Sequence, residues 1–362
     1  MSRRIAIVVG TRPEIIKLGL AARALGAAGR VVHTSQHQDP ELAAVFFADA
    51  RIKPELTLSG ISGLPRHVQI ARMIEQLGDV FTADPPAAVI VQGDTNTASA
   101  AAQAANYAGV PVIHVEAGLR SFDRAMPEEI NRCLIAVAAD VHCAPTELAV
   151  THLCAAGVPQ SRIELTGNTI VEATRRAVPR PAESAAIVRR AGVEPGQFVL
   201  ATIHRPENTD DPLVLETILD QLSKIGLPVL LPLHPRTRLA AGRYGLTAAL
   251  DRLTVQPPAD RRTFLGLASL ARLIVTDSGG IQEECTVLKR PLIVVRRSTE
   301  RPESVAAGFS FIVGPGPQIS DIGRSILADP GLDGRLASTP CPYGDGKASG
   351  RIAAIARRYL TA

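Results

Sequence analysis

The chain has 362 residues, of which 46% are hydrophobic and 20% charged, and 39 basic against 35 acidic residues give a formal net charge of +4. A chain of this length is too long for one ordinary hydrophobic core, so we expect two domains of roughly 100–200 residues each. The absence of tryptophan, the 3% aromatic content and the lack of a dense basic run exclude a base-stacking or backbone-tracking nucleic-acid protein, and we expect no nucleic-acid partner.

The cysteine content and the hydropathy pattern favour a reduced, cytoplasmic protein. Five cysteines form no C-x-x-C pair, and their odd number favours free thiols and gives no support for structural zinc. The apolar run that follows the basic start is too short for the core of a signal peptide. No stretch approaches the ~20 apolar residues of a membrane span. We expect a cytoplasmic protein with no metal and no membrane partner.

The first half of the chain alternates short β-branched runs with Ala- and Leu-rich segments of helical period. Strands are predicted at Ile5–Val9, Ala88–Gln92 and Pro111–Val115, and a helix at Ala98–Tyr107. Such alternation is typical of a parallel sheet that helices cover on both faces. We expect a Rossmann-like domain over residues 1–175.

Proline and glycine interrupt charged helical sequence at Ala173–Pro195, where we expect the domain boundary. A second series of strands then predicts another Rossmann-like domain over residues 195–345. Its strands are predicted at Phe198–Ile203, Pro228–Leu233, Leu253–Gln256, Leu273–Thr276 and Pro291–Val295. The amphipathic segment Gly350–Leu360 predicts a final helix, and we expect residues 346–362 to cross back to the first domain. The expected fold is α/β, with two doubly wound domains facing across a cleft.

Polar residues follow the predicted strands of the first domain, at the edge where open α/β sheets bind ligands. Arg12 and Lys17 lie at a helix start after the first strand and suggest an anion site, the alternative being a turn with solvated charges. Asp94 ends the second of these strands, where it either takes part in chemistry or caps the next helix. Glu116 ends a buried strand, so a functional role is favoured over a structural pair with Arg120.

A helix start is predicted at Pro127, with Glu128 and Glu129 in its first turn. The two glutamates point roughly 100° apart, so only one readily aims into a cleft; the alternative is that both merely favour a helix N-terminus. The apolar residues of this helix fall on one face: Ile130, Leu134 and Val137. Asp94, Glu116 and Glu128 together suit acid/base chemistry, whereas no H-x-x-H spacing suggests a metal.

The second domain offers candidates for binding a phosphorylated ligand. His204 follows its first predicted strand and is a functional candidate, although a lone histidine is otherwise structural, and His234 repeats this pattern more weakly. Gly279 and Gly280 enter a helix after a strand, which lets backbone N–H groups face a diphosphate, and a glutamate one turn later suits ribose hydroxyls. Arg301 supplies a cation beside that site.

The order of these motifs resembles the non-hydrolysing UDP-N-acetylglucosamine 2-epimerase family nearly end to end. The matching segments are Gly10–Glu14, Gln92–Thr95, His114–Arg120, Pro127–Glu129, Thr166–Asn168, His204–Arg205, Asp277–Gly280, Glu300–Glu303 and Pro342–Gly346. The resemblance implies a two-lobed glycosyltransferase-B architecture, no redox cofactor and a homodimer. It also implies a UDP-sugar substrate and interconversion of UDP-N-acetylglucosamine and UDP-N-acetylmannosamine, by elimination of UDP to a 2-acetamidoglucal and re-addition.

The resemblance also implies roles for individual residues. Asp94, Glu116 and Glu128 are the acid/base carboxylates, without an assignment of the C2 base, and His204 assists the departure of UDP. The implied substrate-binding residues, with the diphosphate held by the serine, the glycines and Arg301 and the ribose by the glutamate, are Arg12, Lys17, His234, Ser278, Gly279, Gly280, Glu284 and Arg301.

Three positions depart from the family pattern. Ser35 stands where glycine is common, Arg66–Gln69 matches only loosely the basic–Gln pair that binds a second, regulatory substrate molecule, and Arg297 stands where relatives often have Asp. Activation by substrate and the identity of the sugar therefore stay open. The alternatives are an epimerase-like enzyme for another nucleotide sugar or sugar phosphate, a glycosyltransferase of the same fold, a hydrolysing relative, and a non-catalytic sensor.

Overall fold

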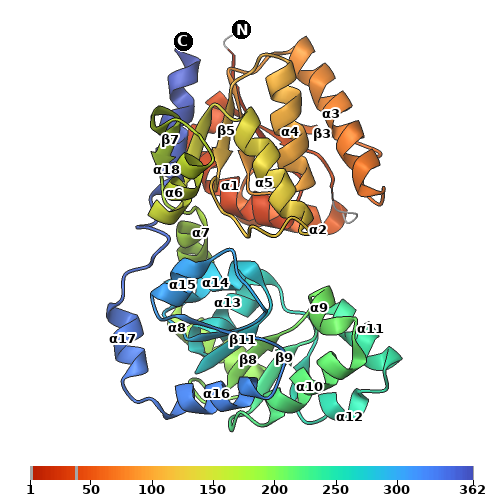
Figure 1. The fold of residues 1–362 in the computed structure, drawn as a ribbon, viewed down its shortest axis with the longest axis vertical. Coiled ribbons are helices and arrows are strands. Elements are labelled where there is room, and N and C mark those ends of the chain that lie inside the picture. The colour runs from red at the N-terminus through yellow and green to blue at the C-terminus, as the bar shows by residue number, and fades with distance from the viewer. Residues whose placement is uncertain (1–2, 37–39, 362) are drawn as a thin grey trace. The chain divides into compact units, whose positions relative to one another are not determined.

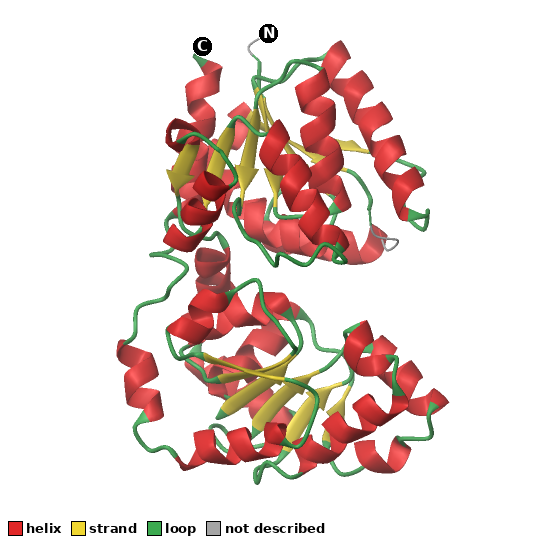
Figure 2. Ribbon diagram, viewed as in Figure 1, coloured by secondary structure: helices red, strands yellow, loops and turns green. Residues whose placement is uncertain are grey.

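The computed structural model describes residues 3–36 and 40–361, which divide into two compact units. Unit 1 comprises Met1–Ala173 and Tyr343–Ala362, and unit 2 comprises Thr174–Pro342. The sequence between the two expected domains, residues 176–194, thus belongs to unit 2. In each unit the strands form one sheet with helices on both sides (Figure 2). The predicted α/β class with two Rossmann-like domains is confirmed.

Unit 1 contains a seven-stranded parallel sheet in the order β3-β2-β1-β4-β5-β6-β7 (Figure 1). Its strands are β1 (Ile5–Val9), β2 (Gly29–His33), β3 (Leu56–Thr57), β4 (Ala88–Gln92), β5 (Val112–Val115), β6 (Val141–Ala144) and β7 (Ile163–Leu165). All residues of β1, β4 and β5 are buried, because helices cover both faces of these β-branched runs. The strand order reverses between β1 and β4, and ligands of such sheets bind at this reversal.

Two helical layers cover the unit 1 sheet. The helices of this unit are α1 (Arg12–Leu25), α2 (Pro40–Ala50), α3 (Arg66–Ala83), α4 (Asn96–Tyr107), α5 (Pro127–Ala138), α6 (Glu147–Ala155) and α18 (Ala348–Arg357), while α7 (Ile170–Ala177) carries the chain into unit 2. Ile7 packs in one cluster with Leu18 of α1 and Ile352 of α18. Val8, on the opposite face, packs in a second cluster with Leu77 of α3. The C-terminal helix α18 is therefore part of the first unit's core.

Two segments that are distant in sequence meet near the return of the chain to unit 1. The N–H of Asn168 donates to the carbonyl of Tyr343 at 2.8 Å, and Tyr343 is fully buried. Gly344 has φ 109°, and a Cβ there would lie 3.1 Å from Cα of Gly167. The tight approach explains why glycine occurs in both segments.

Unit 2 contains a six-stranded parallel sheet in the order β10-β9-β8-β11-β12-β13. Its strands are β8 (Val199–Thr202), β9 (Val229–Pro232), β10 (Thr254–Gln256), β11 (Leu273–Thr276), β12 (Leu292–Val295) and β13 (Ser310–Val313). Its helices are α8 (Pro181–Arg190), α9 (Pro206–Thr209), α10 (Pro212–Ser223), α11 (Pro235–Arg243), α12 (Thr247–Leu250), α13 (Arg261–Leu270), α14 (Gly279–Leu288), α15 (Pro302–Ala306), α16 (Gln318–Ala328) and α17 (Leu332–Ser338). Here the order reverses between β8 and β11.

The apolar face predicted for α5 points outward. Leu134 and Val137 are 46% and 86% exposed, whereas the buried side of this helix carries Glu129, Asn131 and Arg132. The helix is thus amphipathic as predicted, but polar residues occupy much of its inner face. Among the described residues, no helix combines the length and the hydropathy that a membrane crossing requires.

Candidate active site

Glu116 lies just after β5, in a left-handed backbone conformation with φ 63°. Its buried carboxylate places Oε2 2.6 Å from Nζ of Lys17 and 2.6 Å from Nε2 of Gln92. A carboxylate removed from water needs such partners, and the buried Lys17 supplies the opposite charge from α1. The guanidinium of Arg120, the partner in the alternative interpretation, donates to the carbonyl of Leu119 at 2.7 Å.

The carboxyl group of Glu14 binds backbone N–H groups at the N-terminus of α1. Glu14 is fully buried and accepts the N–H groups of Gly10 and Thr11 at 2.9 and 2.7 Å. The hydroxyls of Thr11 and Thr95 donate to the same carboxyl group at 2.8 and 2.6 Å. Burial raises the pKa of Glu14 to about 7, although these hydrogen bonds oppose the shift. The amides of Gly10 and Thr11 therefore already have an acceptor, which the sequence analysis did not predict.

The two cations predicted for this helix start lie in different surroundings. Arg12 is exposed, and its guanidinium carbon is 5.5 Å from the centre of the Phe46 ring. Lys17 is buried and pairs with Glu116. Lys17 therefore orients a candidate acid/base group, and its assignment to substrate binding stays a prediction.

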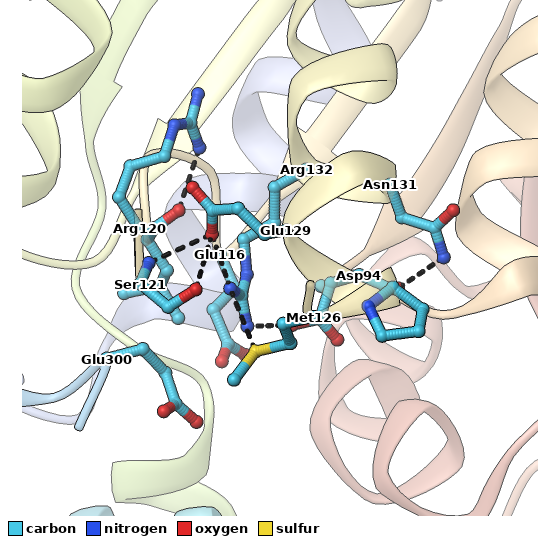
Figure 3. Close-up of polar contacts among 12 residues, drawn as sticks. Asp94, Glu116, Arg120, Ser121, Met126, Glu129, Asn131, Arg132 and Glu300 are labelled. Atoms are coloured by element: carbon cyan, nitrogen blue, oxygen red, sulfur yellow. Dashed lines mark hydrogen bonds and ion pairs between the residues drawn. The ribbon is translucent and has the colours of Figure 1, made fainter. Parts of the chain in front are cut away.

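Asp94 follows β4, and its carboxylate is held by Arg132 of α5 (Figure 3). Arg132 places Nη2 2.5 Å from Oδ2 of Asp94 and Nη1 2.7 Å from Oε2 of Glu129. Burial opposes ionisation of Glu129, but hydrogen bonds from Ser121 and Arg132 outweigh it and lower the pKa of this carboxyl group. The cap of α4 is Thr95, so Asp94 does not have the capping role that was the alternative.

The two glutamates at the start of α5 differ in burial. Glu129 is buried against Arg132, whereas Glu128 is exposed in the first turn of the helix. Glu128 is the predicted acid/base residue. Glu129 holds Arg132 and, through it, the carboxylate of Asp94.

Arg66 links the starts of three helices. From the first residue of α3, its Nε donates to Oδ1 of Asn96 on α4 at 3.1 Å. Its Nη2 donates to Oδ1 of Asn131 at 3.0 Å and to the carbonyl of Pro127 at 2.9 Å, both on α5. Asn131 in turn donates to the backbone carbonyl of Asp94 at 2.8 Å. We call Arg66, Asn96 and Asn131 the helix-start cluster.

In unit 2, a fully buried carboxylate lies under the turn that carries His204. Oδ2 of Asp277 accepts the N–H groups of His204 and Arg205, both at 2.8 Å, and Nδ2 of Asn208 at 3.1 Å. Oδ1 of Asp277 lies 3.1 Å from Nδ1 of His204. The His204 ring is 34% exposed, and its centre is 5.1 Å from that of His234. The two predicted histidines are therefore neighbours.

Ser278, Gly279 and Gly280 form the start of α14, as the sequence predicts. Gly279 lies against Arg301, because a Cβ at this position would be 2.8 Å from Nη1 of that arginine. Apart from its chain neighbours and the backbone of its own helix, Gly280 has no described atom within 4 Å of the place where a Cβ would stand. The structure thus places Arg301 at the helix start where a diphosphate was predicted.

Arg301 belongs to a buried row of alternating charges. Its Nε is 2.8 Å from Oε1 of Glu283, and its Nη1 pairs with Glu300, which in turn pairs with Arg296 at 3.0 Å. Buried ion pairs of this kind add little to the stability of a fold, because removing the charges from water costs free energy. They do hold the guanidinium of Arg301 in one orientation. The carboxylates of Glu283 and Glu300 thus hold Arg301. The sequence analysis gave no role to either residue.

The predicted ribose ligand, Glu284, is partly buried on α14. Its Oε1 is 3.1 Å from Nη2 of Arg261 on α13. His234 begins α11 by accepting the N–H of Arg236 on its Nδ1 at 3.2 Å. The side chains of Glu284 and His234 therefore have defined directions.

A family profile described as UDP-N-acetylglucosamine 2-epimerase matches residues 22–357. The chain belongs to this UDP-N-acetylglucosamine 2-epimerase family. The UDP-N-acetylglucosamine 2-epimerase of Methanocaldococcus jannaschii is 36% identical over 366 residues, which cover 97% of this chain and 98% of the relative. The predicted family and the predicted enzyme class, an isomerase, are confirmed.

Two further matches describe the range of this epimerase family. The UDP-2,3-diacetamido-2,3-dideoxy-D-glucuronate 2-epimerase of Pseudomonas aeruginosa is 35% identical and covers 97% of this chain and 98% of the relative. A crystal structure of the Methanocaldococcus jannaschii UDP-GlcNAc 2-epimerase, in complex with UDP-GlcNAc and UDP, has a TM-score of 0.86 at 34% identity and covers 98% of this chain and 99% of that chain. Relatives of similar identity are thus named for different UDP-sugars.

Two of the three departures from the epimerase family pattern have defined contacts or conformations in unit 1, and the third, Arg297, is an exposed residue of unit 2. Ser35 has φ 54°, so its backbone adopts the left-handed conformation that glycine favours. Arg66 belongs to the helix-start cluster, and Gln69 is buried, donates to the carbonyl of Gln36 at 3.1 Å and accepts from Asn96 at 2.8 Å. Both side chains of the loosely matching segment are therefore engaged within unit 1.

Sequence reasoning gave no role to several buried charged residues of this epimerase chain. Among them are Arg132, Asp277, Glu283 and Glu300. Only Asp277 carried a signal, because it directly follows a buried strand as Asp94 and Glu116 do. The others are recognisable only from their burial against a partner.

Proposed function

We propose that this protein interconverts UDP-N-acetylglucosamine and UDP-N-acetylmannosamine by inverting the configuration at C2. The proposal depends on two carboxylates that follow the adjacent strands β4 and β5. Asp94 forms an ion pair with Arg132, and Glu116 forms one with Lys17. Membership of the epimerase family supports it. Two of the alternatives, a non-catalytic sensor and a glycosyltransferase, are disfavoured, because neither needs two fixed carboxylates at one sheet edge.

The proposed reaction has an elimination and an addition. A carboxylate takes the proton from C2, the electron pair of that bond forms the C1=C2 double bond of a 2-acetamidoglucal, and the C1–O bond breaks with release of UDP. UDP then adds back to C1 through its oxygen, and a proton is delivered to the other face of C2. Two faces require more than one proton-transfer group, and we assign Asp94, Glu116 and Glu128 to these steps.

We assign the binding of UDP to unit 2 and the acid/base carboxylates to unit 1. The start of α14 provides backbone N–H groups for the diphosphate, and Arg301 adds a fixed positive charge beside it. Glu284 is assigned to the ribose, and His204 to the departing UDP. The remaining assignments to substrate are Arg12, Lys17 and His234.

The reaction is tested by incubating the purified protein with UDP-N-acetylglucosamine in D₂O and following C2 and free UDP by NMR. The proposal predicts deuterium at C2 in a mixture of both epimers, with little free UDP. Steady accumulation of UDP with a free sugar indicates a hydrolysing enzyme. Absence of exchange with this sugar contradicts the proposal as stated.

Single substitutions test the carboxylates. We expect Asp94→Asn, Glu116→Gln and Glu128→Gln each to lower kcat by roughly 10²–10⁴, the usual worth of a general acid or base. Glu147→Gln, at an exposed position in the first turn of α6, is the matched control and is expected to retain activity. A variant of the three that keeps wild-type kcat removes that residue from the mechanism.

A second candidate substrate is a UDP-linked diacetamido uronate. The similar identity of the Pseudomonas aeruginosa relative, 35%, favours this candidate. The same NMR experiment with UDP-2,3-diacetamido-2,3-dideoxy-D-glucuronate distinguishes the two candidate substrates. The true substrate is the one whose C2 hydrogen exchanges with less protein in the sample.

We also propose that the protein is a homodimer. The exposed apolar face of α5, with Leu134 and Val137, supports this proposal, because large exposed apolar side chains clustered on one helix are typical of interaction surfaces. In a twofold dimer the same face meets itself.

A further inference from the structure

His204 and Asp277 follow the two strands between which the order of the unit 2 sheet reverses. Strands β8 and β11 pair in parallel, with Thr202 opposite Thr276, so the residues just after each strand lie at the same edge. His204 comes two residues after β8, and Asp277 directly after β11. The sheet topology thus brings an imidazole and a carboxylate together at the ligand-binding edge.

The two oxygens of the Asp277 carboxylate make different contacts. Oδ2 accepts three donors, the N–H groups of His204 and Arg205 and Nδ2 of Asn208, and so fixes the turn after β8. Oδ1 takes no part in the turn. It lies 3.1 Å from Nδ1 of His204, but this contact is not aligned as a hydrogen bond, and Oδ1 has no hydrogen-bond partner among the described residues. Hydrogen bonds of catalytic groups are often poorly aligned without substrate and tighten when it binds, so this short contact suits a pair that forms during the reaction.

We propose that Asp277 is a positioning residue that sets the tautomer and the direction of the His204 ring. A fully buried carboxylate facing Nδ1 favours the form with hydrogen on Nδ1, which leaves Nε2 as the nitrogen directed away from Asp277. Asp277 then acts on the departing and returning UDP only through His204. This inference rests on the role proposed above for His204.

The substitution Asp277→Asn separates positioning from simple support of the turn. Because three donors converge on Oδ2, the amide oxygen of the variant must occupy that place. The NH₂ group then replaces Oδ1 and faces Nδ1 of His204 as a donor. The imidazole is forced to carry its hydrogen on Nε2, the tautomer opposite to that of the wild-type protein.

The test is ¹⁵N NMR of histidine-labelled full-length protein, at a pH where the imidazoles are neutral, with His204→Gln used to assign the signal. We expect the Nδ1–H tautomer in the wild-type protein and the Nε2–H tautomer in Asp277→Asn. His234, whose Nδ1 accepts the N–H of Arg236, provides an internal reference for the second form. A wild-type His204 with hydrogen on Nε2 overturns the proposal, even if the variant does not fold.

Activity gives a second readout. We expect Asp277→Asn to lower kcat at least about 10²-fold while the Kd for UDP changes less than about threefold. The control is Asn208→Ser, which removes one donor to Oδ2 and leaves Oδ1 facing His204. Equal losses in the two variants, with an unchanged tautomer, reduce Asp277 to a structural role. If the wild-type protein does not exchange C2 hydrogen, the proposed function fails, but the tautomer still decides the inference.

Discussion

Glu14 shows how a single buried proton affects this protein. Its carboxyl group is fully buried, and its pKa is raised to about 7, so the folded protein holds a proton between pH 4.5 and 7 that the unfolded chain releases. Stability therefore falls as the pH rises through this range, because the unfolded state binds fewer protons.

We expect Glu14→Gln to remove this loss of stability. The amide oxygen can still accept the N–H groups of Gly10 and Thr11, and the amide NH₂ can donate to Thr95. The variant should match the wild-type protein near pH 4.5 and exceed its free energy of unfolding by up to about 3 kcal/mol above pH 7.

Urea unfolding at pH 5 and pH 8, followed by circular dichroism, measures this difference. Glu147→Gln controls for the loss of a negative charge at an exposed site. A Glu14→Gln effect that is the same at both pH values contradicts the assignment of the proton to Glu14.

Residue types and their places after strands were predictable, whereas their partners were not. Asp94 and Glu116 stand out because burying a carboxylate next to an apolar strand costs free energy unless the carboxylate has a partner or a functional role. The pairing of Glu116 with Lys17 joins residues 99 positions apart, and no periodicity connects them. For the same reason, the sequence alone suggested that Lys17 serves an anionic ligand.

At the scale of elements, the helix-start cluster couples α3, α4 and α5 to the end of β4. Arg66 donates to Asn96, Asn131 and the carbonyl of Pro127, which lies beside Glu128. Lysine cannot replace this planar group, because one ammonium cannot reach three acceptors in the same geometry. The cluster thus fixes the first turn of α5, where a proposed acid/base residue lies.

We expect Arg66→Ala to lower kcat by about 10–10²-fold with a smaller change in KM, because it loosens Glu128 and Asp94 without removing either. Arg66→Lys should recover only part of the loss. Arg72→Ala is the control on the same helix, since Arg72 donates to the carbonyl of Gly60. Steady-state kinetics give kcat and KM for the three variants. A wild-type kcat in Arg66→Ala contradicts the proposed role of the helix-start cluster in positioning Glu128 and Asp94.

Most of the strands that sequence reasoning found are buried on both faces, and the exception is the partly buried edge strand β10. Strands β1, β4 and β11 agree with the prediction to the residue, because long β-branched runs mark central parallel strands. Strands β2 and β7 were not predicted, since one begins with Gly29 and Arg30 and the other has three residues at the sheet edge. The outward apolar face of α5 was equally hidden, because periodicity reports that a helix is amphipathic but not which face is inside.

At the scale of the whole molecule, the chain leaves unit 1 within α7 and returns to it at Tyr343. The predicted boundary, Ala173–Pro195, contains the first crossing and all of α8. This helix belongs to unit 2 because it packs on α13, where a Cβ on Gly266 would lie only 2.9 Å from Cδ1 of Ile187. Contacts of this kind, rather than composition, determine where a domain begins.

The assembly of two copies leads to the last prediction. If the exposed face of α5 meets itself in a twofold dimer, Val137→Lys places two charges in one apolar interface. We expect the dimer Kd to rise at least about 10-fold, as measured by sedimentation velocity over a concentration series. Leu239→Lys is the matched control, because Leu239 is 74% exposed on α11 and outside this face. A wild-type protein that stays monomeric, or a Val137→Lys dimer as stable as the wild type, contradicts the proposed interface.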